Sequence, residues 1–252
     1  MTMVVAHRGA SAYLPENTMP SFERAVEMGA DAIELDVHLT ADEQLAIIHD
    51  ASVDRTTDGS GDVASLTMAE LQELDAGYRY ADAGGSFPHR GSGLRIPTLP
   101  EVLAWLPDGV GLVVEIKARA AADAVVDMLR GTPVREAGRV SAISFDEAAI
   151  DRVHELDPEL ATGYLLVPTQ PFEPALRWAV ENGHAGVHAW EGDLGMDPAP
   201  ALLQAQAYGR QVGCYVVNDP QRMQHLAAFG LWGFVTDVPD VARQALGPRA
   251  TG

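Results

Sequence analysis

The stretch Ala32-Ile33-Glu34-Leu35-Asp36-Val37 places two carboxylates inside a continuous apolar run. Side chains two residues apart on a strand point to the same face, so Glu34 and Asp36 share one face of the strand that this run predicts. Carboxylates in the middle of such a run are not solvated surface groups. The stretch therefore predicts a buried strand with an acidic face.

Short apolar runs recur along the chain and alternate with helical patterns. Most of them are continuous rather than alternating in polarity, which is typical of parallel strands buried on both faces. The predicted strands are Met3–Ala6, Ala32–Val37, Gln44–Ile48, Gly111–Ile116, Val140–Ser144, Ala161–Val167, Ala185–His188, Gln211–Val217 and Gly233–Thr236. With Gln44–Ile48 taken as an extension of the second strand, eight βα units remain. That number favours a single closed (β/α)8 TIM barrel over an open doubly wound sheet.

Several helices between these strands begin with residues that cap free backbone amides. Residues 98–101, Thr-Leu-Pro-Glu, and residues 144–147, Ser-Phe-Asp-Glu, both fit the capping box, in which a hydroxyl and a carboxylate each accept from an amide. Asn17 and Thr18 are expected to cap the first helix.

Residues 50–97 break the alternation of strands and helices. They lack strand periodicity, are rich in Gly, Asp, Ser and Thr, and contain one capped helix that starts near Thr67. A stretch of this length inside a compact fold is usually a functional lid or subdomain. We therefore expect one barrel domain over residues 1–252 with a small insertion after the second strand, at about residues 50–97.

The charge balance narrows the possible partners. The chain has 252 residues, with 36 acidic and 17 basic side chains and a net charge of −19. Binding along phosphates needs a basic stripe, so neither a nucleic acid nor a stable membrane association is expected. No apolar run reaches the roughly 20 residues that span a bilayer, and no signal peptide is visible, so we expect a cytoplasmic protein. The chain has a single cysteine, Cys214, so an intrachain disulfide is excluded. Because Cys214 lies in an apolar run, it is expected to be an inert buried thiol.

Chemically capable side chains follow the predicted strands at their carboxyl ends, where barrel enzymes hold their active residues. Glu34 and Asp36 lie on the second strand, and Glu115 lies near the end of the next one. Three carboxylates that face one lumen repel each other, and a divalent cation removes that cost. Because all the ligands are oxygens, Mg²⁺ or Ca²⁺ is the expected ion. The alternative is a set of buried ion pairs with Arg or Lys, such as Glu115 with Lys117.

Two histidines, His7 and His49, follow apolar strands and precede polar loops. Two imidazoles at neighbouring strand ends, beside a carboxylate cluster, favour general acid–base catalysis near neutral pH. Arg8, next to His7, can offer a bidentate fork to a phosphate. Its alternative is a structural ion pair with Glu16 or a barrel carboxylate. Lys117 is the only lysine in the chain, beside 16 arginines, and lies next to the proposed metal.

The remaining polar candidates are less specific. Four histidines are expected at the surface or in loops, namely His38, His89, His154 and His225. His184 is expected to be structural, and His188 could face either the barrel mouth or the core. The residues expected to line the site at the ends of the last two strands are Tyr215, Asn218, Thr236 and Asp237, although Asp237 could equally be a helix cap.

Taken in order, these motifs resemble the glycerophosphodiester phosphodiesterase family. The resemblance rests on His7-Arg8-Gly9, Pro15-Glu16-Asn17-Thr18, Ser21-Phe22, Gly29-Ala30-Asp31, Glu34-Leu35-Asp36-Val37, His49-Asp50, Arg55-Thr56-Thr57, Leu99-Pro100-Glu101-Val102-Leu103, Glu115-Ile116-Lys117, Ser144-Phe145 and Thr236-Asp237-Val238-Pro239. Each motif alone is weak, but their joint occurrence over nearly the whole chain is highly specific.

The resemblance implies a metal-dependent hydrolase that converts a glycerophosphodiester to sn-glycerol 3-phosphate and an alcohol. It implies one divalent ion on Glu34, Asp36 and Glu115. It also implies a catalytic pair formed by His7 and His49. Finally, it implies that Arg8 and Lys117 bind the phosphoryl oxygens.

The chain departs from the family pattern at two positions. Asp42-Glu43 stands where the family usually has Asp-Gly, which alters the turn after the second strand but removes no functional group. Tyr215 matches a tryptophan of the family, and this substitution leaves the preferred alcohol open.

Three alternatives to this function differ in what they require. A lysophospholipase D-type phosphodiesterase on the same fold would need an apolar groove, and the insertion has few large apolar residues. A non-catalytic glycerol-phosphate binding protein would have lost a histidine or a metal ligand, and all five are present. A metal-dependent sugar isomerase would need histidine ligands among the carboxylates, which is not the pattern here.

Overall fold

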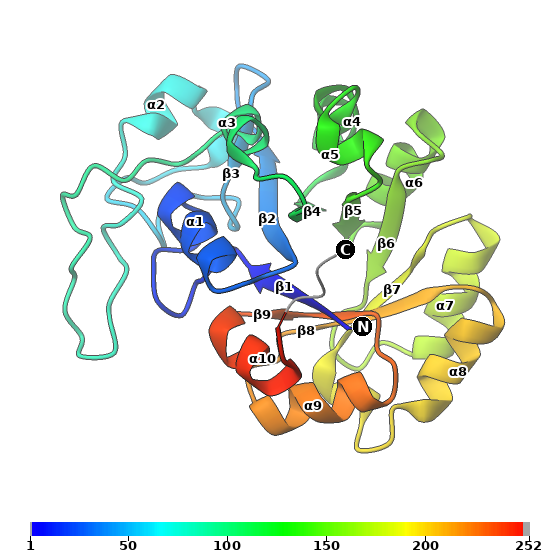
Figure 1. Cartoon of the computed structure of the whole chain (residues 1–252). Coiled ribbons are helices and arrows are strands. Elements are labelled where there is room, and N and C mark those ends of the chain that lie inside the picture. Colours follow the sequence, from blue (N-terminus) through cyan, green and yellow to red (C-terminus); the bar gives the residue numbers. More distant parts are fainter. Residues whose placement is uncertain (1, 249–252) are drawn as a thin grey trace.

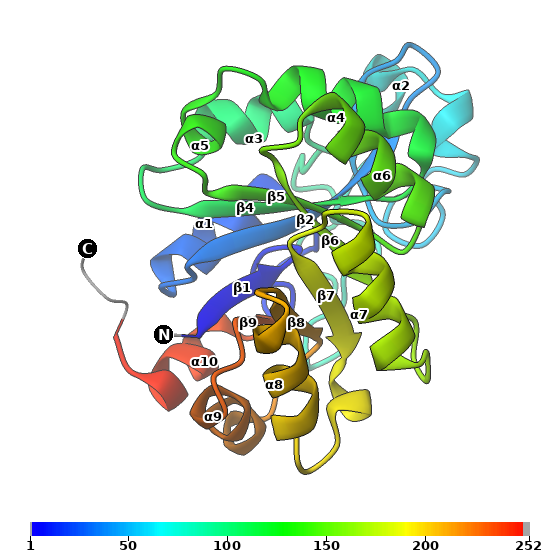
Figure 2. The same ribbon diagram turned by 90° about the vertical axis from the view of Figure 1, so that its right-hand side faces the viewer.

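The computed structural model describes residues 2–248 and contains one closed parallel β-barrel (Figures 1 and 2). The strands run in the order β1-β9-β8-β7-β6-β5-β4-β2, and pairing of β1 with β2 closes the ring. Their bounds are β1 Met3–His7, β2 Ala32–Leu39, β4 Gly111–Ile116, β5 Val140–Ser144, β6 Ala161–Leu165, β7 Gly186–Trp190, β8 Gln211–Tyr215 and β9 Gly233–Thr236. All eight neighbouring pairs in this ring are parallel.

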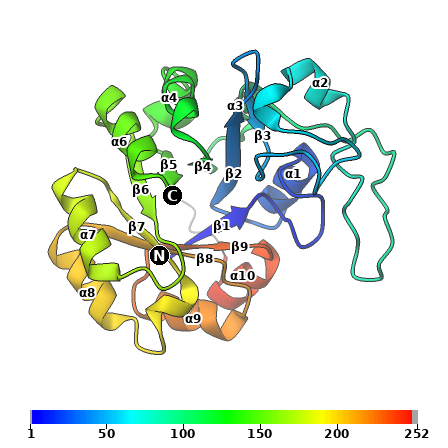
Figure 3. The same cartoon turned by 180° about the vertical axis from the view of Figure 1, so that it is seen from behind.

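One helix follows each barrel strand and covers the outside of the ring, as the view from behind in Figure 3 also shows. These helices are α1 Met19–Glu27, α3 Leu99–Trp105, α4 Ala122–Leu129, α6 Glu147–Leu156, α7 Phe172–Glu181, α8 Ala199–Ala207, α9 Pro220–Ala228 and α10 Pro239–Leu246. Short turns η2 Arg119–Ala121, α5 Pro133–Glu136 and η3 Glu191–Leu194 lie between them. The predicted (β/α)8 barrel with an insertion after the second strand is confirmed. No helix in residues 2–248 combines the length and the apolar character needed to cross a bilayer.

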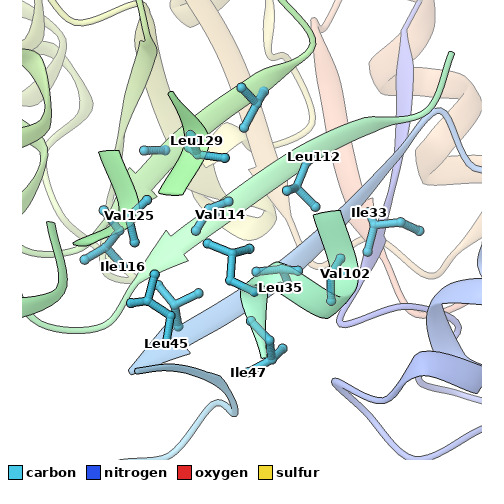
Figure 4. Close-up of a cluster of buried hydrophobic side chains, with 14 of the residues drawn as sticks. Ile33, Leu35, Leu45, Ile47, Val102, Leu112, Val114, Ile116, Val125 and Leu129 are labelled. Carbon is cyan, nitrogen blue, oxygen red and sulfur yellow. The ribbon is translucent and has the colours of Figure 1, made fainter. Parts of the chain in front are cut away.

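The alternation on β2 fixes which side chains face inward. Ile33 and Leu35 are fully buried and point outward, where Figure 4 shows them in one cluster with Leu112 and Val114 of β4 and Val102 of α3. Because neighbouring side chains on a strand face opposite ways, the two β2 carboxylates point into the barrel. The packing of the outer layer thus places the acidic groups inside.

The stretch Gln44–Ile48 does not extend the second strand, contrary to the prediction. It forms β3, Leu45–Ile47, which turns back and pairs antiparallel with the end of β2. A three-residue apolar strand has the same pattern in either direction, so only the turn before it decides the direction. In that turn Glu43 has φ 59°, the left-handed conformation that favours glycine. Glu43 therefore adopts a backbone conformation that is usually adopted by glycine.

Residues 51–97 form a substructure beside the barrel, at the left of Figure 1. It contains η1 Val63–Ser65 and α2 Met68–Gln72, and it has a small apolar core of its own around Val53 and Leu71. The predicted capped helix is confirmed, because Thr67 and Glu70 form a capping box at α2.

Two of the predicted helix caps differ from the structure. The capping box at residues 98–101 is confirmed, but at residues 144–147 it is Asp146 that caps α6, by accepting from the Ala148 amide. Thr18 occupies the N-cap position of α1 without a side-chain cap, and Asn17 does not cap either. The Asn17 amide instead reaches across to the barrel carboxylates.

The amino ends of the strands enclose a hollow of about 460 Å³, whose lining includes His188, Thr162 and Trp232. We call this end the barrel floor. His188 is buried there, and its imidazole makes no hydrogen bond within the described residues but meets Trp232 edge-on, with ring centroids 5.8 Å apart. Gly163 and Gly213 make room for the ring, because a Cβ on either would lie 2.6 Å or 2.3 Å from its nitrogens. His188 thus faces the floor rather than the mouth.

Candidate active site

Three carboxylates converge at the carboxyl ends of β2 and β4. Asp36 pairs in register with Glu115, and Glu34 pairs with His7 of β1, so these side chains point into the barrel together. All three carboxyl groups are buried, and one oxygen of each lies within 4.8 Å of the others. The parallel register of three neighbouring strands therefore builds this cluster.

Two cations contact the cluster. Arg8 Nε lies 3.2 Å from Asp36 Oδ2, and Lys117 Nζ lies 2.8 Å from Asp36 Oδ1 while also contacting Glu115. The ion pairs considered as the alternative to a metal are thus present. They do not balance the site, because three carboxylates face two cations and Arg8 is shared with Glu16, at 2.9 Å.

The pKa values of the carboxyl groups reflect this imbalance. Burial and the neighbouring Asp36 and Glu115 raise the pKa of Glu34 well above its usual range. Burial and Asp36 raise the pKa of Glu115 to about 7. For Asp36, burial acts in the same direction, but Lys117 and Arg8 outweigh it and hold the pKa at about 2. Without a further cation, the three groups cannot all be ionised easily at neutral pH.

One buried oxygen of the cluster is held by an ion pair alone. Asp36 Oδ1 lies 2.8 Å from the Lys117 ammonium but accepts no well-aligned hydrogen bond within the described residues. Three buried carboxylates close enough to share one ion form the all-oxygen donor set that Mg²⁺ and Ca²⁺ prefer. The residues present therefore fit a divalent cation.

His7 is held by an aspartate from the far end of the chain. His7 Nδ1 lies 2.7 Å from Asp237 Oδ1, and Ser11 and Asn218 also donate to Asp237. Burial opposes ionisation of Asp237, but the hydrogen bonds from His7 and these neighbours hold its pKa at about 2. Because the ionised carboxylate can only accept, Nδ1 of His7 carries the proton and Nε2 is left for other partners.

His49 has the same arrangement with its sequence neighbour. His49 Nδ1 lies 2.5 Å from Asp50 Oδ1, and hydrogen bonds from Arg55 and His49 hold the pKa of Asp50 at about 2. Burial lowers the pKa of His49, which favours the neutral imidazole. The backbone carbonyl of His49 contacts His38 Nε2 at 3.0 Å. Both candidate histidines thus have an aspartate on Nδ1, and Nε2 of neither has a hydrogen bond within residues 2–248.

The loop after β1 folds back over the mouth in a constrained conformation. Arg8 has φ 53° and its amide donates to Glu34 Oε2 at 2.9 Å. Gly9 has φ 86°, and a Cβ there would lie 2.4 Å from Ser21 Oγ and 2.6 Å from the Ser21 backbone. Glycine is therefore required at this position. The turn that it allows fixes the position of the Arg8 backbone, from which the guanidinium extends.

Several residues contact the site in ways that the sequence patterns did not predict. Asn17 Nδ2 donates to Asp36 Oδ2 at 2.7 Å, and its left-handed φ of 56° allows this reach. His38 is half-buried beside His49 rather than at the surface. Arg55 was noted only as part of a motif, yet it binds Asp50. The contact made by Asn17 depends on its positive φ, which is known only from the structure. No pattern in the sequence therefore indicated this contact.

A cleft of about 640 Å³ opens beside the cluster and is lined in part by His49, Glu115, Lys117 and Phe145. Phe145 meets Tyr215 edge-on with ring centroids 5.8 Å apart, and the Tyr215 hydroxyl donates to the backbone carbonyl of Leu166. The tyrosine at the position where the family has tryptophan therefore forms part of an aromatic wall near the cleft.

The fold and this site define a TIM-barrel protein with a buried acidic cluster and two aspartate-bound histidines at the mouth. A model of the glycerophosphoryl diester phosphodiesterase family matches residues 7–241. The chain belongs to this family, and the resemblance stated from the motifs is confirmed.

Relatives agree with this assignment over the full length of the match. A putative glycerophosphodiester phosphodiesterase, YhdW of Bacillus subtilis, is 35% identical over 243 residues, covering 94% of this chain and 95% of the relative. A glycerophosphodiester phosphodiesterase of Caldanaerobacter subterraneus is 34% identical and covers 95% of both chains. The predicted enzyme class is thereby confirmed.

Solved structures share the barrel. A phosphodiesterase from Oleispira antarctica, in complex with the product sn-glycerol-3-phosphate, superposes with a TM-score of 0.83 at 27% identity, covering 98% of this chain and 97% of its own. A putative glycerophosphoryl diester phosphodiesterase from Silicibacter pomeroyi gives a TM-score of 0.84 at 26% identity, covering 100% and 96%.

Proposed function

We propose that this protein is a divalent-metal-dependent phosphodiesterase that hydrolyses glycerophosphodiesters to sn-glycerol 3-phosphate and an alcohol. The observation that carries the proposal is that the carboxyl ends of neighbouring strands hold three buried carboxylates together with two histidines that each bind an aspartate. The related Oleispira structure holds sn-glycerol-3-phosphate, which is the product expected here.

Glu34, Asp36 and Glu115 would hold the ion. A bound divalent cation neutralises charge on the phosphoryl oxygens and polarises the phosphorus for attack. The excess of buried carboxylates over the two cations supports this role for the cluster.

His7 and His49 would carry the protons. One imidazole would accept at Nε2 the proton of the attacking oxygen as that oxygen bonds to phosphorus, and the other, protonated at Nε2, would donate to the alkoxide as its bond to phosphorus breaks. Where the attacking oxygen is a hydroxyl of the substrate, water then opens the cyclic phosphate with the two imidazoles in exchanged roles. The Nδ1 contacts with Asp237 and Asp50 support these roles, because they leave both Nε2 atoms without a hydrogen bond within residues 2–248 and stabilise an imidazolium. Two such histidines supply both an acid and a base.

Arg8 and Lys117 would bind the phosphoryl oxygens. Arg8 presents a planar fork and Lys117 a compact ammonium, both against the acidic cluster. Together with a bound ion, these two fixed cations would stabilise the charge that develops on the phosphoryl oxygens at a partly buried site.

The proposal is tested by turnover. The purified protein is dialysed against EDTA and assayed for release of sn-glycerol 3-phosphate from glycerophosphocholine, glycerophosphoethanolamine and glycerophosphoglycerol, with Mg²⁺ or Ca²⁺ added back. We expect chelation to abolish turnover and one of the two ions to restore it. Undiminished turnover in chelator contradicts the metal dependence. Binding of the product without turnover of any substrate supports the glycerol-phosphate binding protein instead.

One observation favours the lysophospholipase D-type alternative. Apolar side chains are exposed on the loops after β5 and β6 and at the last residue of β7, with Phe145 at 40%, Val167 at 51% and Trp190 at 40% exposure. An apolar rim of this kind suits a glycerophosphodiester with an apolar substituent. Comparison of kcat/KM for glycerophosphocholine and lysophosphatidylcholine decides between the two substrates, and a higher value for the lysolipid would favour the alternative.

A further inference from the structure

A continuous series of charged contacts joins one candidate catalytic histidine to the candidate phosphate-binding arginine. His49 binds Asp50, and Arg55 Nε donates to Asp50 Oδ2 at 2.6 Å. Arg55 Nη1 and Nη2 then donate to the two oxygens of Glu16 at 2.8 and 2.7 Å. Glu16 Oε1 accepts in turn from Arg8 Nη1 at 2.9 Å.

Arg55 is the centre of this series because it binds two carboxylates with one planar group. It is paired bidentately with Glu16 and also makes two contacts with Asp50, the second from Nη2 to Oδ1 at 3.2 Å. Such a fork fixes orientation as well as distance, which a lysine ammonium does not do. The two carboxylates come from different parts of the chain, the loop after β1 and the end of β3.

The contacts of Arg55 are expected to affect the catalytic rate more than the folding free energy. The Arg55 side chain is 45% exposed, and exposed ion pairs contribute little to folding free energy, about 0–1 kcal/mol. Orientation matters far more at a reacting centre, where a displacement of about 1 Å costs on the order of 10²-fold in rate. An effect of Arg55 that is large on catalysis and small on folding therefore distinguishes positioning from structural support.

We propose that Arg55, which the insertion contributes, is a positioning residue that orients the His49 imidazole through Asp50 and the Arg8 guanidinium through Glu16. The inference rests on the proposed function, in which His49 moves a proton and Arg8 binds the phosphoryl group. It gives the insertion a role in the chemistry of the site.

The first test uses Arg55→Gln and Arg55→Lys, with Arg79→Gln as the matched control. Arg79 belongs to the same insertion and lines the same 250 Å³ cavity as Arg55, but its Nε donates only to the Thr57 carbonyl. We expect Arg55→Gln to lower kcat by about 10–100-fold, Arg55→Lys to recover part of that loss, and Arg79→Gln to stay within about twofold of the parent. Equal kcat values for Arg55→Gln and Arg79→Gln overturn the proposal.

The second test asks whether the two ends of the series act together. Glu16→Gln removes the anion between the two arginines, and we expect it to weaken binding of sn-glycerol 3-phosphate, measured by calorimetry, because Arg8 loses its fixed partner. The Arg55→Gln/Glu16→Gln double variant is expected to lose little more kcat/KM than the worse single variant. Fully additive losses contradict a shared function.

A third measurement needs no turnover. Long-range ¹H–¹⁵N spectra of the histidine rings, assigned with His49→Gln, report whether Nδ1 of His49 carries the proton. We expect one fixed tautomer in the parent and in Arg79→Gln, and averaged or broadened ring signals in Arg55→Gln. Identical His49 signals in the parent and Arg55→Gln overturn the inference. If the parent hydrolyses no glycerophosphodiester, the proposed function fails, while this spectrum still tests the positioning by Arg55; Arg55→Lys replaces Arg55→Gln if the latter does not fold.

Discussion

Both ends of the barrel contain buried or half-buried histidines, but the surroundings of these histidines differ. At the mouth, His7 and His49 each bind an aspartate through Nδ1 and lie beside charged groups. At the barrel floor, His188 binds no polar group within the described residues and rests between Gly163 and Gly213. Burial lowers its pKa to about 4, so the ring is neutral.

The difference shows that burial and the partner of a histidine together decide whether its ring can carry a proton. An aspartate on Nδ1 fixes the tautomer and stabilises the charged ring, which proton transfer requires. The His188 ring, by contrast, packs against two glycines and the edge of Trp232, so its role is to fill space in the barrel floor. The predictions below test this contrast between mouth and floor.

The largest effect is expected at the mouth. His7→Ala or His49→Ala should lower kcat by about 10²–10⁴-fold, because each removes an acid or base. His188→Leu, in which the floor histidine is replaced, should keep kcat per folded molecule close to that of the parent. Initial rates of glycerophosphocholine hydrolysis measure both. Full activity in either mouth variant would remove that histidine from the mechanism.

Glycines at the two ends should respond differently to an added methyl group. Gly9→Ala collides with the backbone of Ser21 at a positive φ, so it should destabilise the fold by about 3 kcal/mol and displace Arg8. At Gly213 the atoms nearest to an added Cβ belong to the His188 side chain rather than to the backbone, and φ is not positive, so Gly213→Ala should cost about 1–2 kcal/mol and leave kcat unchanged. Chemical denaturation and product release measure the two quantities. Equal losses of stability would contradict the contrast.

His188 should make the floor sensitive to acid. Its folded pKa of about 4 lies below the unfolded value of about 6.5. As the pH falls below 6.5 the unfolded state therefore binds the proton first, and the free energy of unfolding decreases until about pH 4. Between pH 7 and pH 5 the loss should be about 2 kcal/mol. Urea unfolding of the parent and His188→Leu at both pH values isolates this contribution, and parallel pH dependences in the two proteins would refute it.

The smallest effect is expected in the turn between β2 and β3, near the mouth. Glu43→Gly should raise the free energy of unfolding by about 0.5–1 kcal/mol, because glycine adopts the left-handed φ of 59° without strain. Asp42→Gly is the control and should be destabilising, since the Asp42 carboxylate accepts from Thr40 and from the Met68 amide. Thermal unfolding ranks the three proteins, and a less stable Glu43→Gly would count against the strain.

Much of the fold follows from local patterns in the sequence. Continuous apolar runs identified the barrel strands, and Thr98 with Glu101 identified the start of α3, because these signals depend on residues a few positions apart. The direction of β3 did not follow, since three apolar residues look alike in both directions. Asn17 was misjudged for a similar reason: its side chain suits a helix cap, but the barrel carboxylate competes for it.

Local sequence patterns are sufficient to specify the acidic face of β2, the histidines at the strand ends and the separation of the outer and inner sides of the barrel. These features follow from residues a few positions apart and need no distant residue. The partners that these side chains meet depend on how the chain folds in three dimensions. Asp237 reaches His7, and Glu16 reaches Arg55, across 230 and 39 positions of the chain. Closure of the barrel creates these contacts, because it is the ring of parallel strands, and no local pattern, that brings their carboxyl ends to one mouth.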